Sequence, residues 1–324
     1  MKRVAVLGLG LIGGSLLRRL GERGIGYDRA PATRAAAARD GYAVAHTVQD
    51  ALREADTVVL AVPLPALPGL LDQVAPHAAA GTLLTDVTSV KAPVLALVRE
   101  RAPALSYVGG HPMAGTEASG WDAGHTDLFA GAAWVTCLEP DTDLAAWVRL
   151  ARGVTGWGCR VVPCGAAAHD QAVARISHLP HLLAATLAAG AVDGPAGRLA
   201  LALAAGSFRD GTRVAATRPE LSAAMCAGNA AALAAELDAL VARLAEVRPL
   251  LTDPDKLAGW LAPGHDARQR WAAQLKAGPV PELLRGSLAD PEPLRRALLA
   301  LGAAGGHVAS VNTQGDRVTL ACVQ

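Results

Sequence analysis

The residues best suited to chemistry in this chain lie in the segment 111–117, where a histidine precedes hydroxyl and carboxyl side chains. Oxidation of an alcohol requires that its hydroxyl proton be removed while a hydride leaves the carbon. Histidine is the side chain whose ordinary pKa suits proton removal near neutral pH, so His111 is a candidate general base. A histidine before a proline in a glycine-rich stretch is also common in ordinary loops, so the motif needs support from the rest of the chain.

The amino terminus gives that support, because it has the strand, tight turn and helix of a dinucleotide-binding fold. Residues 3–7 are an apolar strand and residues 14–20 continue a helix. The turn between them consists of Gly8, Leu9, Gly10, Leu11, Ile12 and Gly13. The first glycine permits the tight turn, the second lets the backbone approach a pyrophosphate, and the third lets the helix pack on the strand. Backbone N–H groups at the start of the helix, around Leu11 and Ile12, then face the phosphates.

An acidic residue, Asp28, follows a second short strand and lies 20 residues after Gly8. In dinucleotide-binding folds an acid at this position accepts hydrogen bonds from the adenosine ribose. A 2′-phosphate would meet like charge there, so we expect NAD as the cofactor. Arg29 and Arg34 keep NADP open, because a nearby arginine can hold a 2′-phosphate.

Composition argues against several other classes of protein. The 324 residues carry a formal net charge of +1, and only 18% are charged, with no Lys/Arg block, so we expect no nucleic-acid partner. Apolar runs are too short to span a bilayer and the amino terminus does not resemble a signal peptide, which predicts a cytoplasmic protein with no membrane partner. The five cysteines include no C-x-x-C pair and no zinc spacing with histidine, so we expect reduced cysteines and no metal.

Alternating helix-like and strand-like segments continue to about residue 165. Strand-like apolar segments recur at residues 57–62, 82–87, 132–137 and 159–162. Runs of this kind are typical of parallel strands that are buried on both faces. A short strand at 106–110 would carry His111 at its carboxyl end, where open α/β sheets place ligands. We therefore expect residues 1–165 to form a Rossmann-type, doubly wound sheet domain in which all these strands join one sheet.

The composition changes after residue 165, where long Ala/Leu-rich segments at helical spacing run to about residue 276. Breaks are expected at residues 190–197, 206–211 and 249–254. Residues 166–284 are thus predicted to form an all-helical domain. Its apolar residues outnumber those that one small helical layer needs, which favours a subunit interface in a homodimer, although a locally apolar core would give the same excess.

Several separated blocks resemble the prephenate and arogenate dehydrogenase family of tyrosine biosynthesis. These blocks are residues 8–15, 86–91, 111–120, 177–181 and 206–213. The resemblance covers roughly residues 3–280 and implies a Rossmann-type nucleotide domain followed by a helical dimerisation domain. It further implies that His111 is the catalytic base, that Ser89 hydrogen-bonds at the reacting hydroxyl, and that Arg213 binds a substrate carboxylate.

The activity implied by this resemblance is oxidative decarboxylation of prephenate to 4-hydroxyphenylpyruvate, with hydride transfer from ring C4 to NAD. Ser177 and His181 are expected near the substrate, and the neighbouring His178 is expected in the core. Thr116 and Glu117 are expected to support or gate the site, with a solvated loop as the other interpretation. Lys91 is interpreted as a residue that caps or solvates the helix after Ser89.

Other functions stay open at this point. Arogenate carries an amine where prephenate carries a keto group, and the sequence does not distinguish the two substrates. A 3-hydroxyacid dehydrogenase would share the two-domain layout, but a resemblance to that family implies a catalytic lysine early in the helical domain. No lysine lies between Lys91 and Lys256. A regulatory nucleotide-binding protein without catalysis is a third alternative, against which Ser89, His111 and Arg213 argue.

Residues 285–324 lie beyond the family resemblance and predict a small α/β tail. We expect a helix from about 290 to 301, then strands at 307–311 and 317–321 joined by a turn. This pattern resembles part of a regulatory ACT domain but is too short for a whole one. A two-stranded hairpin is marginal alone in water, so the tail must dock on the body or on a partner subunit, and we favour a role in supporting the dimer.

Overall fold

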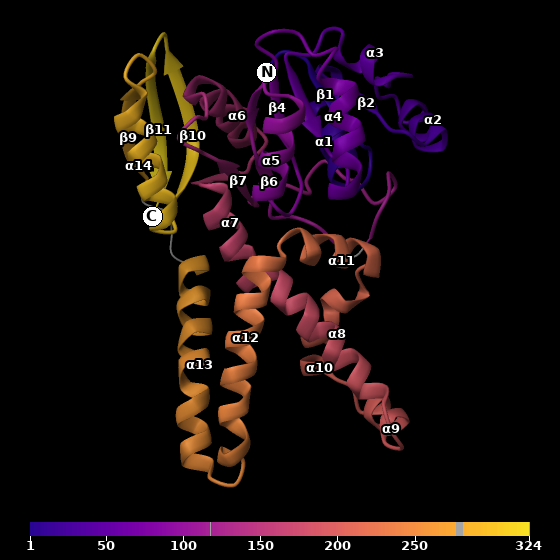
Figure 1. The fold of residues 1–324 in the computed structure, drawn as a ribbon, viewed down its shortest axis with the longest axis vertical. Coiled ribbons are helices and arrows are strands. Elements are labelled where there is room, and N and C mark those ends of the chain that lie inside the picture. Colours follow the sequence, from indigo (N-terminus) through magenta and orange to yellow (C-terminus); the bar gives the residue numbers. More distant parts are fainter. Residues whose placement is uncertain (117, 277–280, 324) are drawn as a thin grey trace.

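The structure is a computed structural model that describes residues 1–116, 118–276 and 281–323. A body built on two sheets carries a set of helices that extend from one side of it (Figure 1). The first sheet has five parallel strands in the order β2-β1-β3-β4-β5. Its strands are β1 (Val4–Leu7), β2 (Gly24–Tyr27), β3 (Thr57–Leu60), β4 (Leu83–Asp86) and β5 (Ser106–Val108). The Rossmann-type arrangement expected from the sequence is confirmed.

Helices and short helical turns link these strands and cover the sheet. They are α1 (Leu11–Leu20), η1 (Gly21–Arg23), α2 (Pro31–Arg39), α3 (Val48–Leu52), η2 (Leu64–Ala66), α4 (Leu67–Val74) and α5 (Ala92–Arg101). Strands β1, β3 and β4 are buried over their whole length, as their continuous apolar sequences predict for strands covered on both faces. On one face, β-strand residues pack with α3, α4 and α5 in one apolar cluster.

The second sheet has six strands in the order β6-β7-β8-β10-β11-β9. They are β6 (Gly110–Pro112), β7 (Ala133–Cys137), β8 (Arg160–Cys164), β9 (Glu282–Ser287), β10 (His307–Gln314) and β11 (Arg317–Val323). The prediction that β7 and β8 extend the first sheet is therefore wrong. The chain leaves the parallel sheet at Gly109, and β6 then pairs antiparallel with β7, so the apolar pattern correctly marked strands but could not specify their partners.

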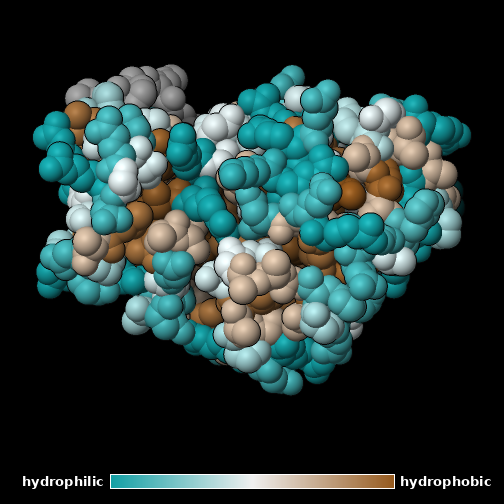
Figure 2. Space-filling view, turned by 90° about the horizontal axis from the view of Figure 1, so that it is seen from above, coloured by the Kyte–Doolittle hydropathy of each residue, from teal (hydrophilic) through white to brown (hydrophobic). Residues whose placement is uncertain are grey.

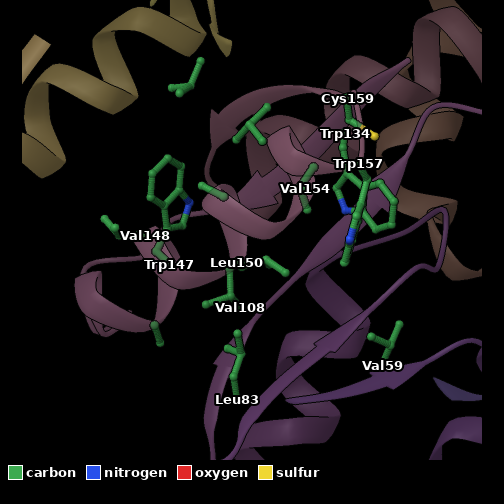
Figure 3. Close-up of a cluster of buried hydrophobic side chains, with 14 of the residues drawn as sticks. Val59, Leu83, Val108, Trp134, Trp147, Val148, Leu150, Val154, Trp157 and Cys159 are labelled. Atoms are coloured by element: carbon green, nitrogen blue, oxygen red, sulfur yellow. The ribbon is translucent and has the colours of Figure 1, made fainter. Parts of the chain in front are cut away.

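Three bulky side chains join the two sheets through one core. Figure 3 shows Trp134, Trp147 and Trp157 with Leu150 and Val154, close to Val59, Leu83 and Val108 of the first sheet. Helix α6 (Leu144–Gly156) supplies most of this contact, because seven of its residues are buried. The same cluster continues into the carboxyl-terminal tail, so the two sheets and the tail share one hydrophobic interior.

The tail docks on the body of its own chain (Figure 1, yellow). Val308 of β10 pairs with Val161 of β8, and α14 (Pro291–Ala303) packs on β8. Buried Arg295 of α14 donates to the Glu139 carbonyl at 2.6 Å and the Thr142 carbonyl at 2.9 Å. The tail also has a strand, β9, that the sequence did not reveal, so residue 285, the expected boundary, falls inside a strand. Three strands and a helix thus dock as an extension of the second sheet.

The helical region follows β8 and runs to residue 276. It comprises α7 (Ala166–Val173), the π-helical turn η3 (Ala174–His178), α8 (Leu179–Val192), α9 (Gly197–Ala202), α10 (Gly206–Thr212), η4 (Arg213–Ala216), α11 (Pro219–Gly228), α12 (Ala230–Val247), η5 (Arg248–Leu250) and α13 (Pro254–Lys276). The expected break at 206–211 is instead helix α10, whose glycines permit a helix but do not require a loop. Helices α12 and α13 run side by side away from the body (Figure 1).

The surface differs between the body and these helices. Figure 2 views the end of the molecule opposite the tips of α12 and α13, where hydrophilic side chains cover most of the face and hydrophobic ones show in hollows between them. Large apolar side chains are exposed on the helices, among them Leu187, Leu199, Leu201, Val241 and Trp271. Within the described residues no single helix is long and apolar enough to span a membrane, and α11 with Ala230–Leu250 meets that test only as a pair bent by 95°.

Candidate active site

His111 lies in β6 at the junction of the two sheets and the helical region, with 9% of its surface exposed. Its Nδ1 is 2.8 Å from Nε2 of His169 on α7, and Nδ1 of His169 is 2.7 Å from Oδ1 of Asp170. Asp170 also accepts hydrogen bonds from the backbone N–H groups of Lys91 and Ala92, each at 2.8 Å. A continuous chain of polar contacts thus joins β6, the start of α5 and the start of the helical region.

The surroundings of this chain set the charges of its members. Burial lowers the pKa of His111 well below 6.5, and the neighbouring His169, Lys91 and His178 lower it further. Burial alone would raise the pKa of Asp170, but hydrogen bonds from His169 and from the backbone of Ala92 and Lys91 outweigh it and hold that pKa below its usual value. His111 is therefore neutral at physiological pH and Asp170 is ionised.

A second buried network supports the other side of β6. The Lys91 side chain is 1% exposed, forms an ion pair with fully buried Asp86, and donates to the Gly110 carbonyl at 2.6 Å and Thr88 Oγ1 at 3.1 Å. Asp86 also accepts from the Tyr107 hydroxyl at 2.7 Å and the Gly110 N–H at 3.1 Å. The interpretation of Lys91 as a capping or solvated residue is wrong, because a buried ammonium needs this carboxylate beside it.

Ser89 lies in the loop between β4 and α5 and is half-buried. Its neighbour Val90 packs against Gly228 at the end of α11, where a Cβ atom would lie 3.3 Å from Val90 Cγ2. The helical region therefore rests directly on the loop that carries Ser89. No hydrogen bond joins Ser89 to His111 among the described residues, so the two are brought to the same junction without being linked in the free protein.

The helical region contributes a second group of expected residues. His181 on α8 is half-buried and its Nδ1 is 3.4 Å from Ser222 Oγ on α11. Burial lowers the pKa of His181, and the charge of Arg213 lowers it further. The elements that carry the two residues, α8 and η4, pack on one another. Arg213 begins η4 and is exposed, while Ser177 in η3 is half-buried. His181 and Arg213 thus lie on neighbouring elements, and both side chains reach the surface.

His178 occupies the space between these two residues and the His169–Asp170 pair, and is fully buried, as expected. Its Nδ1 lies 3.1 Å from Asn229 Nδ2, which also donates to the Asp170 carbonyl at 2.7 Å. Burial lowers the pKa of His178 to about 4, with Asp170 opposing that effect and His169 and His181 adding to it. His178 thus lowers the pKa of His111, and His181 lowers that of His178.

The segment after β6 carries Thr116, which makes a local hydrogen bond. Thr116 is exposed, and its hydroxyl accepts a hydrogen bond from the Ala118 backbone at 3.3 Å. Glu117 lies outside the described residues. The structure brings together His111, His169, Asp170 and Lys91 by direct contact, and none of its hydrogen bonds among described residues joins Thr116 to them.

The glycine-rich turn has the geometry that a dinucleotide requires. Gly8 has φ +104°, and a Cβ there would lie 2.3 Å from the Ala61 carbonyl oxygen. A Cβ on Gly13 would lie 1.9 Å from the Gly8 oxygen, so both positions need glycine for packing. At Gly10, by contrast, a Cβ would meet no atom within 4 Å, and no side chain caps the N-terminus of α1. Open space and unpaired N–H groups therefore coincide at Gly10, Leu11 and Ile12, which fits a bound pyrophosphate.

Asp28 lies beside this turn. Its Oδ2 accepts a hydrogen bond from the Leu9 backbone at 2.8 Å and its Oδ1 accepts one from the Ala30 backbone at 2.9 Å. Arg34 donates to the Asp28 carbonyl at 2.6 Å. Each carboxylate oxygen keeps a second lone pair that can accept a ribose hydroxyl. The same side chain can thus hold the turn and recognise a nucleotide.

This combination of a glycine-rich βα turn, an acid after β2 and a neutral buried histidine at the carboxyl edge of the sheet defines a nucleotide-dependent oxidoreductase. Comparison with known proteins specifies the family. Residues 13–162 match the model for the prephenate dehydrogenase nucleotide-binding domain, and residues 165–262 match the model for the prephenate dehydrogenase dimerization domain. The chain belongs to the prephenate dehydrogenase family and is a dehydrogenase with a nucleotide-binding domain.

Individual relatives agree with this family over most of the chain. The cyclohexadienyl dehydrogenase of Zymomonas mobilis is 35% identical over 264 residues, which cover 78% of this chain and 90% of that protein. A solved structure from Corynebacterium glutamicum, provisionally assigned as a prephenate dehydrogenase, is 41% identical, with a TM-score of 0.78 over 84% of this chain and 88% of that one. Synechocystis arogenate dehydrogenase is 32% identical, with a TM-score of 0.71 over 83% and 99%.

Proposed function

We propose that this protein oxidises and decarboxylates prephenate to 4-hydroxyphenylpyruvate, with NAD as the hydride acceptor. The observation that carries the proposal is His111, a histidine held neutral by burial and bound through one ring nitrogen, which leaves its other nitrogen available to a substrate. Prephenate carries the hydroxyl group that such a base acts on, at ring C4, opposite the carboxylate at C1. Membership of the prephenate dehydrogenase family supports this choice of substrate.

His111 acts as the general base on the C4 hydroxyl. Its lowered pKa keeps it unprotonated at neutral pH, so it can accept the hydroxyl proton as the C4 hydride leaves. Ser89, in the adjoining loop, orients the hydroxyl toward the base. Loss of the hydride allows the C1 carboxylate to leave as carbon dioxide, and the ring becomes aromatic, which makes the reaction effectively irreversible. NAD, when bound, supplies the hydride acceptor.

The helical region holds the substrate's charged end. Arg213 is exposed and forms no salt bridge with an acidic residue among those described, so its planar guanidinium is available for a bidentate contact with a carboxylate. His181 lies beside it and can donate a further hydrogen bond, with Ser177 on the preceding turn. We assign Arg213, His181 and Ser177 to substrate binding, and Thr116 and Glu117 to supporting or gating the site.

The nucleotide is held by the turn from Gly8 to Gly13, with phosphates at the start of α1 and the adenosine ribose at Asp28. A 2′-phosphate would lie against the Asp28 carboxylate, which favours NAD over NADP. Arg34 Nη1 donates to the carbonyl groups of Asp28 and Arg29, so an arginine lies beside this acid, and comparable kcat/KM values with NAD and NADP would reject the preference.

A homodimer is part of the proposal. The exposed apolar side chains of α8, α9, α12 and α13 lie in the region that matches a dimerization domain, and a second copy would remove them from water. The tail packs on the body of its own chain, so we assign it to stabilising the body and, through it, the dimer. Sedimentation should show a dimer. Hydrogen exchange should then show that backbone amides of the helical region are protected in that dimer.

The proposal is tested with purified protein, NAD and either prephenate or arogenate, by following reduced cofactor and carbon dioxide together. We expect equal amounts of both products with prephenate. Arogenate is the second candidate, because the 32% identical Synechocystis enzyme is an arogenate dehydrogenase and the substrates differ only in an amine or keto group. A higher kcat/KM with arogenate would replace prephenate as the substrate, and no turnover of either would reject the proposed function.

A further inference from the structure

We propose that His169 and Asp170 are positioning residues that fix the tautomer of His111, so that its Nε2 carries the lone pair and serves as the base. The proposal deepens the function proposed above and rests on it for the chemistry. The tautomer itself is a property of the free protein and can be measured without a substrate.

The assignment starts at the Asp170 carboxylate. Its two oxygens accept hydrogen bonds from the Lys91 and Ala92 backbone N–H groups and face Nδ1 of His169. A backbone N–H can only donate, and an ionised carboxylate can only accept. The proton between Asp170 and His169 therefore resides on His169 Nδ1. Asp170 is itself held by the backbone at the start of α5, so it cannot easily turn away.

The second step applies to the neutral form of His169. A neutral imidazole carries one N–H, and Nδ1 already bears it, so Nε2 of His169 has only a lone pair. That Nε2 lies 2.8 Å from Nδ1 of His111, which must then be the donor. His111 is left with a proton on Nδ1 and a free lone pair on Nε2. This is the tautomer that a general base requires, and the opposite tautomer would present an N–H to the substrate hydroxyl.

The groups facing the pair make this arrangement the stable one. His111 faces His169 from α7, Lys91 from the start of α5 and His178 from η3, and all three disfavour a positive charge on it. His169 faces Asp170, the only carboxylate among the described residues that contacts either ring. A positive charge on His169 would thus lie 2.7 Å from a carboxylate oxygen, whereas no contact of this kind is found for His111 among the described residues.

This difference gives the pair a second effect during turnover. When His111 Nε2 accepts the substrate proton, its Nδ1 proton can move to His169 Nε2 across the 2.8 Å contact. His111 is then neutral again, with its proton on Nε2, and His169 carries the positive charge beside ionised Asp170. The site has thus gained one proton, and the positive charge lies on His169. The starting state returns when His111 Nε2 releases its proton to water and the proton on His169 Nε2 moves back to His111 Nδ1.

The resting tautomer can be read by ¹⁵N nuclear magnetic resonance of histidine-labelled protein. The chain has nine histidines, and the His111→Asn variant identifies the signals of His111. We expect a protonated Nδ1 and an unprotonated Nε2 at neutral pH in the wild-type protein. In Asp170→Asn the new amide can donate to Nδ1 of His169, which moves the His169 proton to Nε2. His169 then donates to Nδ1 of His111, so Nε2 of His111 should become protonated. A protonated Nε2 in the wild-type protein would overturn the proposal.

Kinetics of three variants then separate positioning from folding. Asp170→Asn should lower kcat by about 10²–10⁴-fold with KM changed little, because the base is present in the wrong tautomer. His169→Gln keeps an oxygen that accepts from His111 Nδ1, whereas His169→Leu does not. We expect the Gln variant to be at least about tenfold faster than the Leu variant, since most of the loss comes from the tautomer.

A matched change outside the site controls for general effects. His307→Gln, on β10 in the tail, is expected to keep wild-type kcat, tautomer and melting temperature. A purely structural role for the pair would give equal losses in His169→Gln and His169→Leu, or a kcat in Asp170→Asn within about threefold of wild type, and either result would overturn the proposal. Absence of turnover in wild-type protein with the expected tautomer present would instead count against the proposed function.

Discussion

The two walls of the proposed site are built differently. On the nucleotide side, His111 and Lys91 are buried and each has a fixed partner, His169 for the former and Asp86 for the latter. On the helical side, Arg213 is exposed, and His181 is half-buried with one long contact to Ser222. The polar groups of the first wall are thus held by partners within the chain, whereas those of the second wall are open to solvent.

This difference matches the tasks proposed for the two walls. A base must be held in one tautomer and at one distance before the substrate arrives, because reorganisation during the reaction would cost rate. A carboxylate-binding group can be ordered by the substrate itself, and its charge stays hydrated until then. The contrast predicts that changes on the first wall affect kcat or folding, and that changes on the second affect KM.

The largest expected effect is on catalysis at the first wall. His111→Asn keeps a polar group of similar reach but removes the base, so kcat should fall by about 10²–10⁴-fold. Steady-state kinetics and NAD titration measure the two quantities, and NAD affinity should stay near that of the wild type. Retention of more than about a tenth of the rate would demote His111 to a structural residue and erase the contrast.

The next effect is on folding. Lys91→Met leaves the Asp86 carboxylate buried without its cation, and removing one partner of a buried pair costs about 3–5 kcal/mol. Urea unfolding should show this loss of the free energy of unfolding. The double variant Lys91→Met/Asp86→Asn should regain part of it, because no uncompensated charge remains. Equal stability of Lys91→Met and wild-type protein would mean that this pair does not support β6.

The second wall is tested by Arg213→Ala. Loss of a charge-assisted bidentate contact is worth on the order of 1.5–3 kcal/mol, so KM for the substrate should rise by at least about tenfold while kcat changes less. Arg209→Ala, a nearby exposed arginine on α10, is the matched control and should keep the wild-type KM. An unchanged KM in Arg213→Ala would place the carboxylate contact elsewhere.

The smallest effect concerns the pH dependence of stability. His178 has a pKa of about 4 in the folded protein and 6.5 as its ordinary value, so the unfolded chain takes up its proton first as pH falls. Stability is therefore full above about pH 6.5 and decreases toward about pH 4, by at most about 1.4 kcal/mol per pH unit for this group. His178→Gln should reduce that slope in urea unfolding series. An identical slope would show that the pKa of His178 does not differ between the folded and the unfolded protein.

Much of the first wall's framework could be predicted from the sequence. The strands β1, β3 and β4, the glycine-rich turn and the position of Asp28 follow from local patterns, because each needs only near neighbours in the chain. The strand partners of β7 and β8 were not predictable in this way, because a buried apolar strand has the same sequence pattern whichever sheet it joins. The strand β9 was missed because its apolar pattern is short: only two leucines stand together, and an arginine and a glycine follow them.

The support of His111 was also missed, for a physical reason. His169 and Asp170 are 58 and 59 residues away in sequence, and Asp86 and Lys91 look like ordinary surface residues until their burial is known. The available signal was the pair His169-Asp170 at the start of an Ala-rich helix. Two adjacent polar residues among alanines indicate a specific contact when that part of the helix is buried. The family resemblance identified His111, Ser89 and Arg213 but did not specify what holds them.

We propose that hydride leaves C4 of prephenate while His111 takes the hydroxyl proton, and a substrate labelled at C4 tests this step. Prephenate carrying deuterium at C4 is incubated with the enzyme and NAD, and the reduced cofactor is analysed by mass spectrometry. We expect the deuterium in the reduced nicotinamide together with an equal amount of carbon dioxide, and we expect His111→Asn to form both at a rate lower by about 10²–10⁴-fold. Reduced cofactor without deuterium, or carbon dioxide without reduced cofactor, would contradict it.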